Sequence, residues 1–412
     1  MGLGSMVGTG VFVSIGVAAG VAGPAVVLAI LVAAGVAVCN ALSSAQLAAS
    51  HPVSGGAYEY GYRCLTPALG FTAGWMFLCA KSASAATAAI GFAGYLMHVL
   101  GFSDTLPVSL PAAAIAILVT ALVLSGLKRS NLANLLIVAV TLSSLTLFVV
   151  VAGASALRGN SGHLRPFLPQ GADGFRNFLQ GCALMFVAYT GYGRIATMGE
   201  EVKDPRRNIP RAIIAVTTLS AVLYLSVGIT AIASFGAEPL GETTRLQAAP
   251  LETVLRSLGH PAAGTLVALG AMTAMLGVLL NLILGLSRVA LAMGRRRDLP
   301  AIFARLHPAH NNPSAAVVGV GLLVTGLTLL GDVKLTWSFS AFTVLVYYAI
   351  TNLAALRLSA EQRLYPRWIS FTGIAACLFL AFWVDPAVWI TGLALIAAGL
   401  LWHLFRQRTC RP

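Results

Sequence analysis

The segment Gly4-Ser5-Met6-Val7-Gly8-Thr9-Gly10-Val11-Phe12-Val13 interrupts an apolar helix with small and polar residues. About half a chain later, Phe186-Val187-Ala188-Tyr189-Thr190-Gly191-Tyr192-Gly193-Arg194 does the same. Glycine weakens a helix and leaves backbone polar groups without intrahelical partners. Inside hydrocarbon such groups must find other partners. Interrupted helices at corresponding places in two halves of a membrane protein predict a binding site between them.

The rest of the chain has the composition of an integral membrane protein. Of its 412 residues, 58% are hydrophobic and only 9% are charged, whereas a soluble domain carries roughly 25% charged residues. Apolar segments of about 20 residues or more favour membrane helices over barrel strands. We predict an all-α protein with twelve spans, at residues 2–21, 24–47, 67–97, 108–127, 132–157, 178–198, 210–235, 263–292, 315–330, 335–356, 368–383 and 387–405.

The spans divide into two similar sets of five. Residues 1–157 and residues 158–357 each begin with an interrupted helix, followed by a helix that opens at a proline, Pro24 or Pro210. Proline at the first helical turn costs little because that N–H is unpaired anyway. An odd number of spans per repeat would place the second repeat in the membrane inverted. Residues 358–412 hold the last two spans and a tail.

The net charge of +13 is a topology signal. Of the 26 lysines and arginines, 18 fall on one side of the predicted membrane and six on the other, with Lys81 and Arg194 inside spans. The positive-inside rule assigns the richer side to the cytoplasm. Both termini are then cytoplasmic, in a multi-pass protein of the plasma membrane. The partner that this charge indicates is the lipid bilayer, and we expect no nucleic acid.

The cysteines and the amino terminus carry little functional information. None of the six cysteines forms a CxxC pair, so we expect neither a metal site nor a disulfide framework. We expect no cleavable signal peptide, because no charged region precedes the first apolar stretch. Only seven residues precede Gly8, whereas a half-helix needs roughly ten to cross half a bilayer. We therefore expect the chain to begin late within its first helix.

Several loop and helix motifs resemble those of the amino acid–polyamine–organocation permeases. They are Gly-Thr-Gly-Val-Phe at Gly8 to Phe12, Pro-x-Ser-Gly-Gly-Ala-Tyr at Pro52 to Tyr58, Ala-Tyr-x-Gly at Ala188 to Gly191, Glu-x-x-x-Pro-x-Arg-x-Ile-Pro at Glu201 to Pro210, and Ser287-Arg288 with Leu299-Pro300. The resemblance implies a LeuT-type fold of two inverted five-helix repeats plus two further helices. It also implies secondary transport of amino acids or related amines. The region Leu135 to Thr141 lacks the lysine that some proton-coupled relatives carry in span 5.

The first interruption offers an anion site. Gly8, Thr9 and Gly10 would leave N–H groups free at the end of a half-helix, where the helix dipole favours negative charge. The α-carboxylate of an amino acid is the predicted guest. The alternative is a close helix–helix contact, because Gly4 and Gly8 have the small-xxx-small spacing.

The second interruption offers the opposite polarity. Carbonyl groups around Phe186, Ala188, Tyr189 and Gly191 could accept hydrogen bonds from a substrate ammonium, and aromatic faces could close over it. The alternative is that these aromatics face lipid. Phe186, Tyr189 and Tyr192 are all candidate gates.

Lys81 lies near the middle of a span, with Phe77 one turn before it, and both are candidate substrate contacts. A buried ammonium costs several kcal/mol unless it is paired. Lys81 could bind the substrate carboxylate, or it could carry the proton that a span 5 lysine carries in some relatives. The alternative is a lysine that snorkels to the interface.

The remaining candidates are polar residues near the second half of the site. Arg194 could hold an anion or pair with Glu200 or Glu201, which we also consider for a gate of ion pairs. A plain solvated loop is the alternative for the two glutamates. Asn281 could line the cavity or bond a neighbouring helix.

The predicted function is secondary active transport of an amino acid by alternating access, coupled to a proton or a counter-substrate. A neutral substrate is favoured because no predicted span carries an Asp or Glu to pair with a cationic side chain. The alternatives are a sensor that binds without transport and a transporter of a related amine. A channel would need a polar filter, and an enzyme would need a catalytic constellation that the seven histidines do not form. We expect no cofactor, and a monomer or homodimer.

Overall fold

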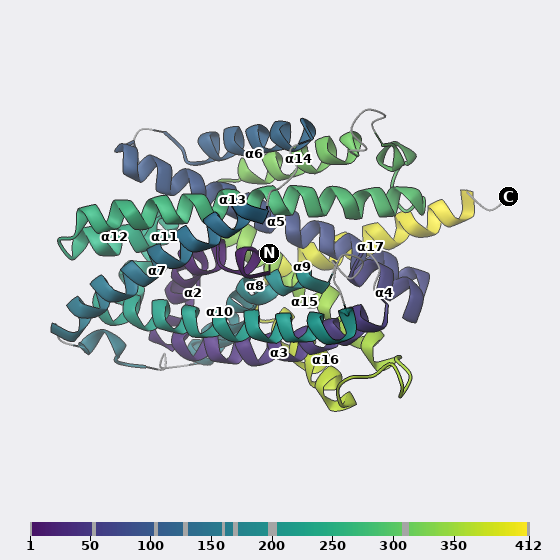
Figure 1. Ribbon diagram of the computed structural model, residues 1–412, viewed down its shortest axis with the longest axis horizontal. Helices are drawn as coiled ribbons and strands as arrows, with labels where there is room; N and C mark the ends of the chain where they lie inside the picture. Colours follow the sequence, from purple (N-terminus) through teal and green to yellow (C-terminus); the bar gives the residue numbers. More distant parts are fainter. Residues whose placement is uncertain are drawn as a thin grey trace.

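The computed structural model describes residues 2–51, 55–102, 106–126, 131–158, 161–167, 172–196, 204–306 and 313–409, and every regular element in these ranges is helical. The long helices lie roughly parallel to one another along the longest axis of the molecule (Figure 1). In this part of the chain seven helical segments are long and apolar enough to cross a membrane, and three shorter apolar helices accompany them. The chain is therefore a multi-pass membrane protein.

The elements follow the predicted spans in order. The first half contains α1 (Gly2–Met6), η1 (Gly10–Ser14), α2 (Ile15–Ala22), η2 (Gly23–Ala25), α3 (Val26–Ser50), α4 (Ala57–Cys64), α5 (Pro67–Leu100), α6 (Ser109–Leu124) and α7 (Asn131–Arg158). The second half contains η3 (Ser161–Leu164), α8 (Ala172–Tyr189), η4 (Thr190–Tyr192), α9 (Gly193–Ala196), α10 (Pro205–Phe235), α11 (Ala237–Gln247), α12 (Pro250–Ser257), α13 (Pro261–Arg295), η5 (Ala301–Ala304), α14 (Ser314–Thr328) and α15 (Val333–Leu356). Two further helices, α16 (Arg367–Ala381) and α17 (Pro386–Thr409), complete the chain.

Both predicted interruptions are present. Helix α1 ends at Met6, and a short π-helix, η1, starts at Gly10. Helix α8 ends at Tyr189 and passes through a 3-10 turn before α9 begins at Gly193. Such irregular turns inside helices are frequent at functional sites.

The two interruptions touch each other. A Cβ atom on Gly191 would stand 2.3 Å from the carbonyl oxygen of Ser5, and a Cβ on Gly10 would stand 2.7 Å from Cβ of Ala188. Glycine at both positions therefore permits a backbone approach that any side chain would block. Segments about half a chain apart in sequence thus form one junction in space.

Among the helices long enough to span a membrane, some lie at the centre of the bundle and others at its rim. Most of the apolar window of α5, α13 and α15 is buried, whereas α7 and α17 expose most of theirs. Large apolar side chains such as Leu135, Leu157 and Leu401 are exposed on those outer helices. An apolar surface of this kind suits contact with lipid.

The loops contain more structure than predicted. Helices α11 and α12 occupy the segment between Gly236 and His260, which lies outside the predicted spans, and Leu240 and Glu252 are fully buried there. These two helices cover one end of the bundle, opposite to α4 and the end of α17 (Figure 1). Helix starts were also set too late, because α8 begins at Ala172 and α10 at Pro205. The first turns of both helices contain polar and charged residues, so hydropathy alone does not assign them to a span.

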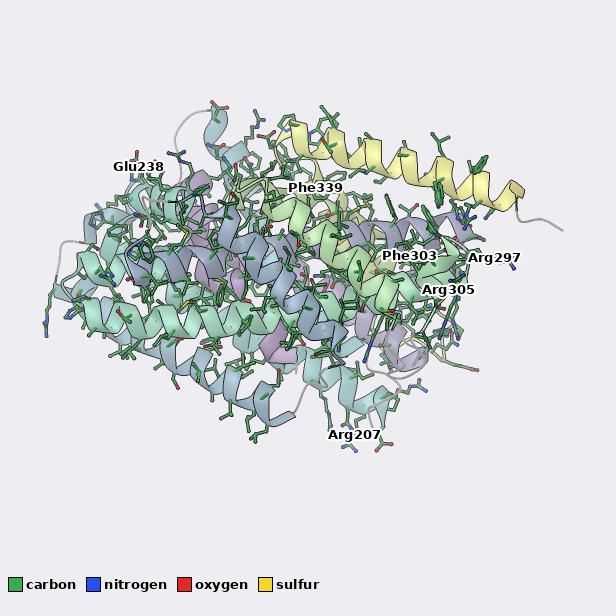
Figure 2. The ribbon with its side chains drawn as sticks, turned by 90° about the horizontal axis from the view of Figure 1, so that it is seen from above. Arg207, Glu238, Arg297, Phe303, Arg305 and Phe339 are labelled. Carbon is green, nitrogen blue, oxygen red and sulfur yellow. The ribbon has the colours of Figure 1, made fainter. Side chains whose placement is uncertain are left out.

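Arginines gather at one end of the folded bundle. Figure 2 shows Arg207, Arg297 and Arg305 toward the end of the bundle where α17 finishes, and Glu238 toward the opposite end. We call the first the arginine-rich end. Arg295, the last residue of α13, and Arg296, which follows it, lie beside Arg297 at this end.

Candidate functional site

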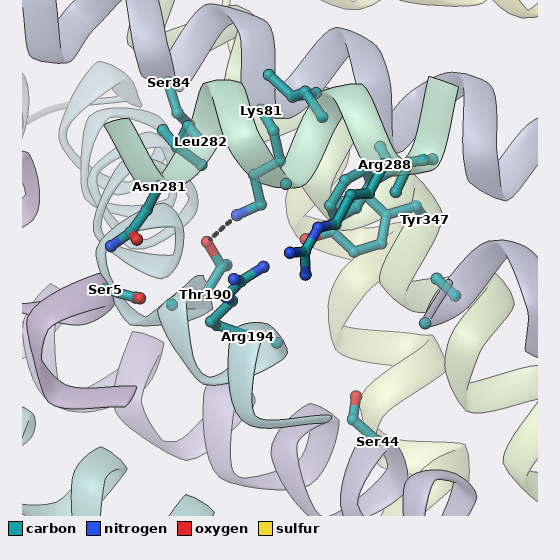
Figure 3. Close-up of a pocket in the computed structure, with 18 of the residues that line it drawn as sticks. Ser5, Ser44, Lys81, Ser84, Thr190, Arg194, Asn281, Leu282, Arg288 and Tyr347 are labelled. Atoms are coloured by element: carbon teal, nitrogen blue, oxygen red, sulfur yellow. Dashed lines mark hydrogen bonds between the residues drawn. The ribbon is translucent and has the colours of Figure 1, made fainter. Parts of the chain in front are cut away.

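A cavity of about 670 Å³ lies where the two interruptions meet α5, α13 and α15. Cavities of this size are typical of small-molecule sites. The interruptions contribute to its wall Ser5, Met6, Thr9, Gly10, Val187, Ala188, Thr190, Gly191, Gly193 and Arg194. The central helices contribute Phe77, Lys81, Ser84, Asn281, Leu282, Gly285, Arg288, Trp337, Tyr347 and Tyr348, among others (Figure 3). The cavity continues past Gly56 and Glu59 toward the arginine-rich end.

In the first interruption, Thr9 and Gly10 line the cavity and Gly8 does not. Thr9 is 4% exposed, and its hydroxyl oxygen finds no hydrogen-bond partner among the described residues. The carbonyl of Gly8 accepts bonds from the N–H groups of Val11 and Phe12, and a Cβ on Gly8 would press on Val278. Gly8 therefore makes a close contact with helix α13, as in the alternative interpretation, while Thr9 and Gly10 face the cavity.

In the second interruption, Ala188 and Gly191 line the cavity. The carbonyl of Val187 accepts a hydrogen bond from the Thr190 hydroxyl at 2.8 Å, and that of Ala188 accepts one from Tyr224 at 3.0 Å. Side chains thus satisfy part of the backbone that the break frees. A carbonyl oxygen has two lone pairs, so each can accept a second bond from a ligand.

The candidate aromatic gates lie behind the wall of the cavity. Phe186 and Tyr189 are fully buried and are not lining residues in this structure. The Phe186 ring meets Tyr348 edge-on at 5.9 Å, and the Tyr189 hydroxyl donates to the carbonyl of Ile30 at 3.3 Å. Tyr192 also packs on Tyr348, at 5.5 Å. None of these three faces lipid.

Lys81 points into the centre of the protein. It is 9% exposed, and its Nζ donates a 2.8 Å hydrogen bond to the Thr190 hydroxyl, as Figure 3 shows. Because Thr190 donates in turn to the carbonyl of Val187, Lys81 is connected to the second interruption. Its ammonium therefore does not snorkel. Phe77, one turn earlier, also lines the cavity and meets Tyr347 edge-on at 5.6 Å.

The other predicted polar residues divide into two groups. Asn281 and Arg194 both line the cavity, so each faces a potential ligand. Glu200 and Glu201 lie outside the described residues, and their pairing with Arg194 or within a gate stays a prediction.

An ion-pair network not predicted from sequence lies at the arginine-rich mouth of the cavity. Arg296 donates to both carboxylate oxygens of Glu59, at 2.9 and 2.7 Å, and its guanidinium lies 4.4 Å from the centre of the Tyr62 ring. Tyr58 and Tyr62 each donate a 2.7 Å bond to the carboxylate of Asp298. Burial, and then the Asp298 carboxylate, raise the pKa of both tyrosines, so both remain protonated donors at neutral pH.

Sequence reasoning also missed several residues of the cavity wall. Thr190 stood inside a quoted motif without a role, and Arg288 was counted only as a topology cation. Tyr347 and Tyr348 follow one another in a predicted span, and an aromatic pair with hydroxyl groups at that depth was the available signal.

An all-helical membrane protein with two touching helix breaks around a cavity has the arrangement of a membrane transporter. A family model described as amino acid permease matches residues 1–408. The chain belongs to the amino acid permease family, and the resemblance to the amino acid–polyamine–organocation superfamily is confirmed.

Similar proteins agree with this class. An uncharacterized transporter of Mycobacterium tuberculosis is 40% identical over 403 residues, which are 97% of this chain and 88% of the relative. The branched-chain amino acid permease of Bacillus subtilis is 28% identical over 98% of this chain and 89% of its own length. A vacuolar cationic amino acid transporter of Arabidopsis thaliana is 28% identical over 85% of this chain and 60% of its own length.

Proposed function

We propose that the protein is a secondary active amino acid transporter that works by alternating access. The observation that carries the proposal is the cavity at the contact of the two interruptions, whose lining reaches one end of the bundle. Residues 1–157 and 158–357 would be the two inverted repeats that move against each other around it.

The two interruptions would bind the common part of an amino acid. Helix η1 and its continuation α2 begin at the cavity, so their N-terminal end and the Thr9 hydroxyl favour the α-carboxylate. Helix α8 ends at the cavity, so its last carbonyls favour the α-ammonium. The opposed polarity of the two ends matches a zwitterion.

The structure supports one closed end and one open end. On the side of α11 and α12, the Tyr95 hydroxyl donates a 3.0 Å hydrogen bond to the carbonyl of Phe12. Both residues are fully buried, so this packed contact would close that end of the cavity. On the other side the cavity reaches Gly56 and Arg296. By the positive-inside rule the open end would face the cytoplasm and carry both termini, with the protein in the plasma membrane.

Lys81 would couple transport to protons, or would bind the substrate in an exchanger. Its bond to Thr190 reaches the second interruption, so a change in its protonation would alter the contacts of that segment. A bound amino acid could compete for the same hydroxyl. This link between a titratable group and the binding site supports a proton as the partner ion.

The family leaves the substrate open, because the relatives are named for branched-chain and for cationic amino acids. The only carboxylate among the cavity's described lining residues is Glu59, which already pairs with Arg296. A cationic amino acid or a polyamine would therefore find no counter-charge for its side chain. We propose a substrate without a positive side chain, for which a neutral amino acid is the minimal case.

Uptake into proteoliposomes tests this function. We expect saturable uptake of at least one labelled amino acid, stimulated by a pH gradient or by a counter-substrate inside the vesicles. Binding of the same amino acid without uptake would instead identify a sensor. Uptake that ignores the pH gradient would reject the proton role of Lys81 and leave its binding role standing.

A further inference from the structure

One tyrosine bridges the two interruptions. The Tyr224 hydroxyl of α10 donates to the carbonyl oxygen of Met6 at 2.7 Å and to that of Ala188 at 3.0 Å. Met6 is the last residue of α1, and Ala188 lies in the last turn of α8. Carbonyl groups at such helix ends have no partner within the helix. A single side-chain atom therefore serves backbone groups from both halves of the chain.

This bridge differs from other aromatic donors around the breaks. The Tyr95 hydroxyl donates to the carbonyl of Phe12 at 3.0 Å, and the Tyr348 hydroxyl donates to that of Thr190 at 3.4 Å. Each of these two donors serves one interruption. Tyr224 instead joins two segments that lie about half a chain apart in sequence.

The packing of α10 holds the Tyr224 hydroxyl in place. Tyr224 is fully buried within the 31-residue helix, and its ring packs against Tyr189 at 5.0 Å. One turn later, a Cβ on Gly228 would stand 2.8 Å from the side chain of Ile30, so α10 lies directly against α3. A Cβ on Gly10 would stand 3.3 Å from the Tyr224 oxygen. The hydroxyl is thus confined to the junction between the two breaks.

The bridge leaves hydrogen-bonding capacity unused. A hydroxyl has one hydrogen, so Tyr224 can donate fully to only one of the two carbonyl oxygens at a time. A buried acceptor without a full hydrogen bond favours any further donor. Met6 and Ala188 both line the cavity, so that donor can come from a bound ligand. An ammonium group is suited to this place, because it brings three hydrogens and a positive charge.

We propose that Tyr224 is the positioning residue of the ammonium site. Its hydroxyl holds the Met6 and Ala188 carbonyl oxygens toward one point, where the substrate ammonium completes their hydrogen bonding. This role rests on the proposed function, in which the helix breaks bind an amino acid. Two carbonyl dipoles whose negative ends approach each other repel, so the two oxygens would separate without the shared hydrogen. Tyr224 is not a lining residue of the described cavity, and it acts through the two backbone groups.

The test compares an amino acid with its α-hydroxy acid, which carries a hydroxyl in place of the α-ammonium. The labelled amino acid that wild-type proteoliposomes take up best is inhibited by its unlabelled form or by the hydroxy acid, such as lactate for alanine or phenyllactate for phenylalanine. The readout is the half-inhibitory concentration of the hydroxy acid divided by that of the amino acid. In Tyr224→Phe this ratio should fall about tenfold, because the amino acid binds less tightly and the hydroxy acid binds as before.

A second variant covers the case in which Tyr224→Phe does not fold. Tyr224→4-aminophenylalanine keeps the ring and has one N–H for each carbonyl oxygen, so it should fold. Because both oxygens then have a donor without the substrate, the ratio should fall about threefold. A ratio equal to that of the wild type would overturn the proposed role.

Ser226→Ala is the matched control, because it removes a hydroxyl from the same helix whose 2.8 Å bond, to the carbonyl of Val222, stays within α10. Its ratio should equal that of the wild type, and a symmetric gel-filtration peak would show that each variant folds. Equal losses for the amino acid and the hydroxy acid in Tyr224→Phe, or no loss, would overturn the inference, since a merely structural tyrosine affects both alike. Absence of uptake of every amino acid by the wild type would instead contradict the proposed function itself.

Discussion

At the scale of single residues, the lysine of α5 is the most unusual group in the protein. Lys81 is 9% exposed inside a 34-residue apolar helix, and its ammonium bonds to the Thr190 hydroxyl. A charge at that depth is costly, and such residues commonly mark substrate or proton pathways. The bond to Thr190 makes Lys81 a link between the central helix and the second interruption.

We predict that Lys81→Met lowers uptake at least about tenfold and abolishes its dependence on a pH gradient, because the ammonium that bonds to the second interruption through Thr190 is removed. Thr190→Val, which keeps the shape and removes the hydroxyl, should lower uptake less, since Lys81 remains. Hydrogen bonds to charged groups contribute about 1.5–3 kcal/mol. Lys334→Met is the control, because Lys334 is an exposed lysine at the other end of the bundle. Full, pH-dependent uptake by Lys81→Met would contradict this role.

The sequence could predict only some of the residues that line the cavity. Lys81 was detectable because a charge in an apolar span has few explanations. Arg288 was not, because a basic residue near a helix end first satisfies the positive-inside rule. Phe186 and Tyr189 were placed beside the correct break, but sequence could not show that they face away from the cavity. That orientation is decided by contacts with α3 and α15, distant in the chain.

At the scale of elements, the contact between the two interruptions depends on glycine. We predict that Gly191→Ala lowers both uptake and thermal stability, because its methyl group would stand 2.3 Å from the carbonyl oxygen of Ser5 and the backbone would have to move. Gly35→Ala is the matched control, since no atom lies within 4 Å of its Cβ position in α3. In a helix interior that control should be neutral or stabilising by about 0.5–1 kcal/mol. Equal uptake and melting temperature for the two variants would refute the role of this contact.

A second junction between elements ties the last helix to the mouth of the cavity. Asp298 is 4% exposed, accepts bonds from Tyr58 and Tyr62, and lies 3.0 Å from Nδ1 of His403 in α17. The Asp298 backbone carbonyl also accepts a 2.8 Å bond from the Trp402 indole. Helices α4 and α17 thus meet at one buried carboxylate.

We predict that Asp298→Asn lowers stability by about 1–3 kcal/mol, since one of its carboxylate acceptors becomes a donor facing other donors. Thermal unfolding of the purified protein in detergent measures the effect. Asp385→Asn serves as the control, because Asp385 caps only the exposed start of α17. A melting temperature of Asp298→Asn equal to that of the control would show that the junction contributes little.

Elements were predicted better than their contacts. Hydropathy located every span that the structure shows as helical, because apolar length is a local property. The short helices α4, α11 and α12 lie outside the predicted spans, since their polar sequences resemble loops. Their helicity is stabilised by packing on α5, α2 and α13, which no local pattern reveals.

At the scale of the whole molecule, the lining of the cavity extends from the two interruptions to Gly56 and Arg296 at the arginine-rich end. We predict that a cysteine at Leu282, which lines the cavity, reacts with a membrane-impermeant thiol reagent from the side that carries the carboxyl terminus. A cysteine at Thr265, half-buried at the other end of α13, should react from the opposite side. Both variants are compared with the parent chain, whose own cysteines set the background. Labelling of Leu282→Cys from the Thr265 side alone would contradict this polarity.

The central claim is that two helix breaks form one site whose amino acid is carried across the membrane. The most direct measurement is counterflow in proteoliposomes loaded with a high concentration of unlabelled amino acid, with the labelled form outside. The account predicts that label accumulates transiently above its equilibrium level in wild-type vesicles, and that Gly191→Ala vesicles lose most of this overshoot. No overshoot for any amino acid, in vesicles whose protein binds one, would contradict the account.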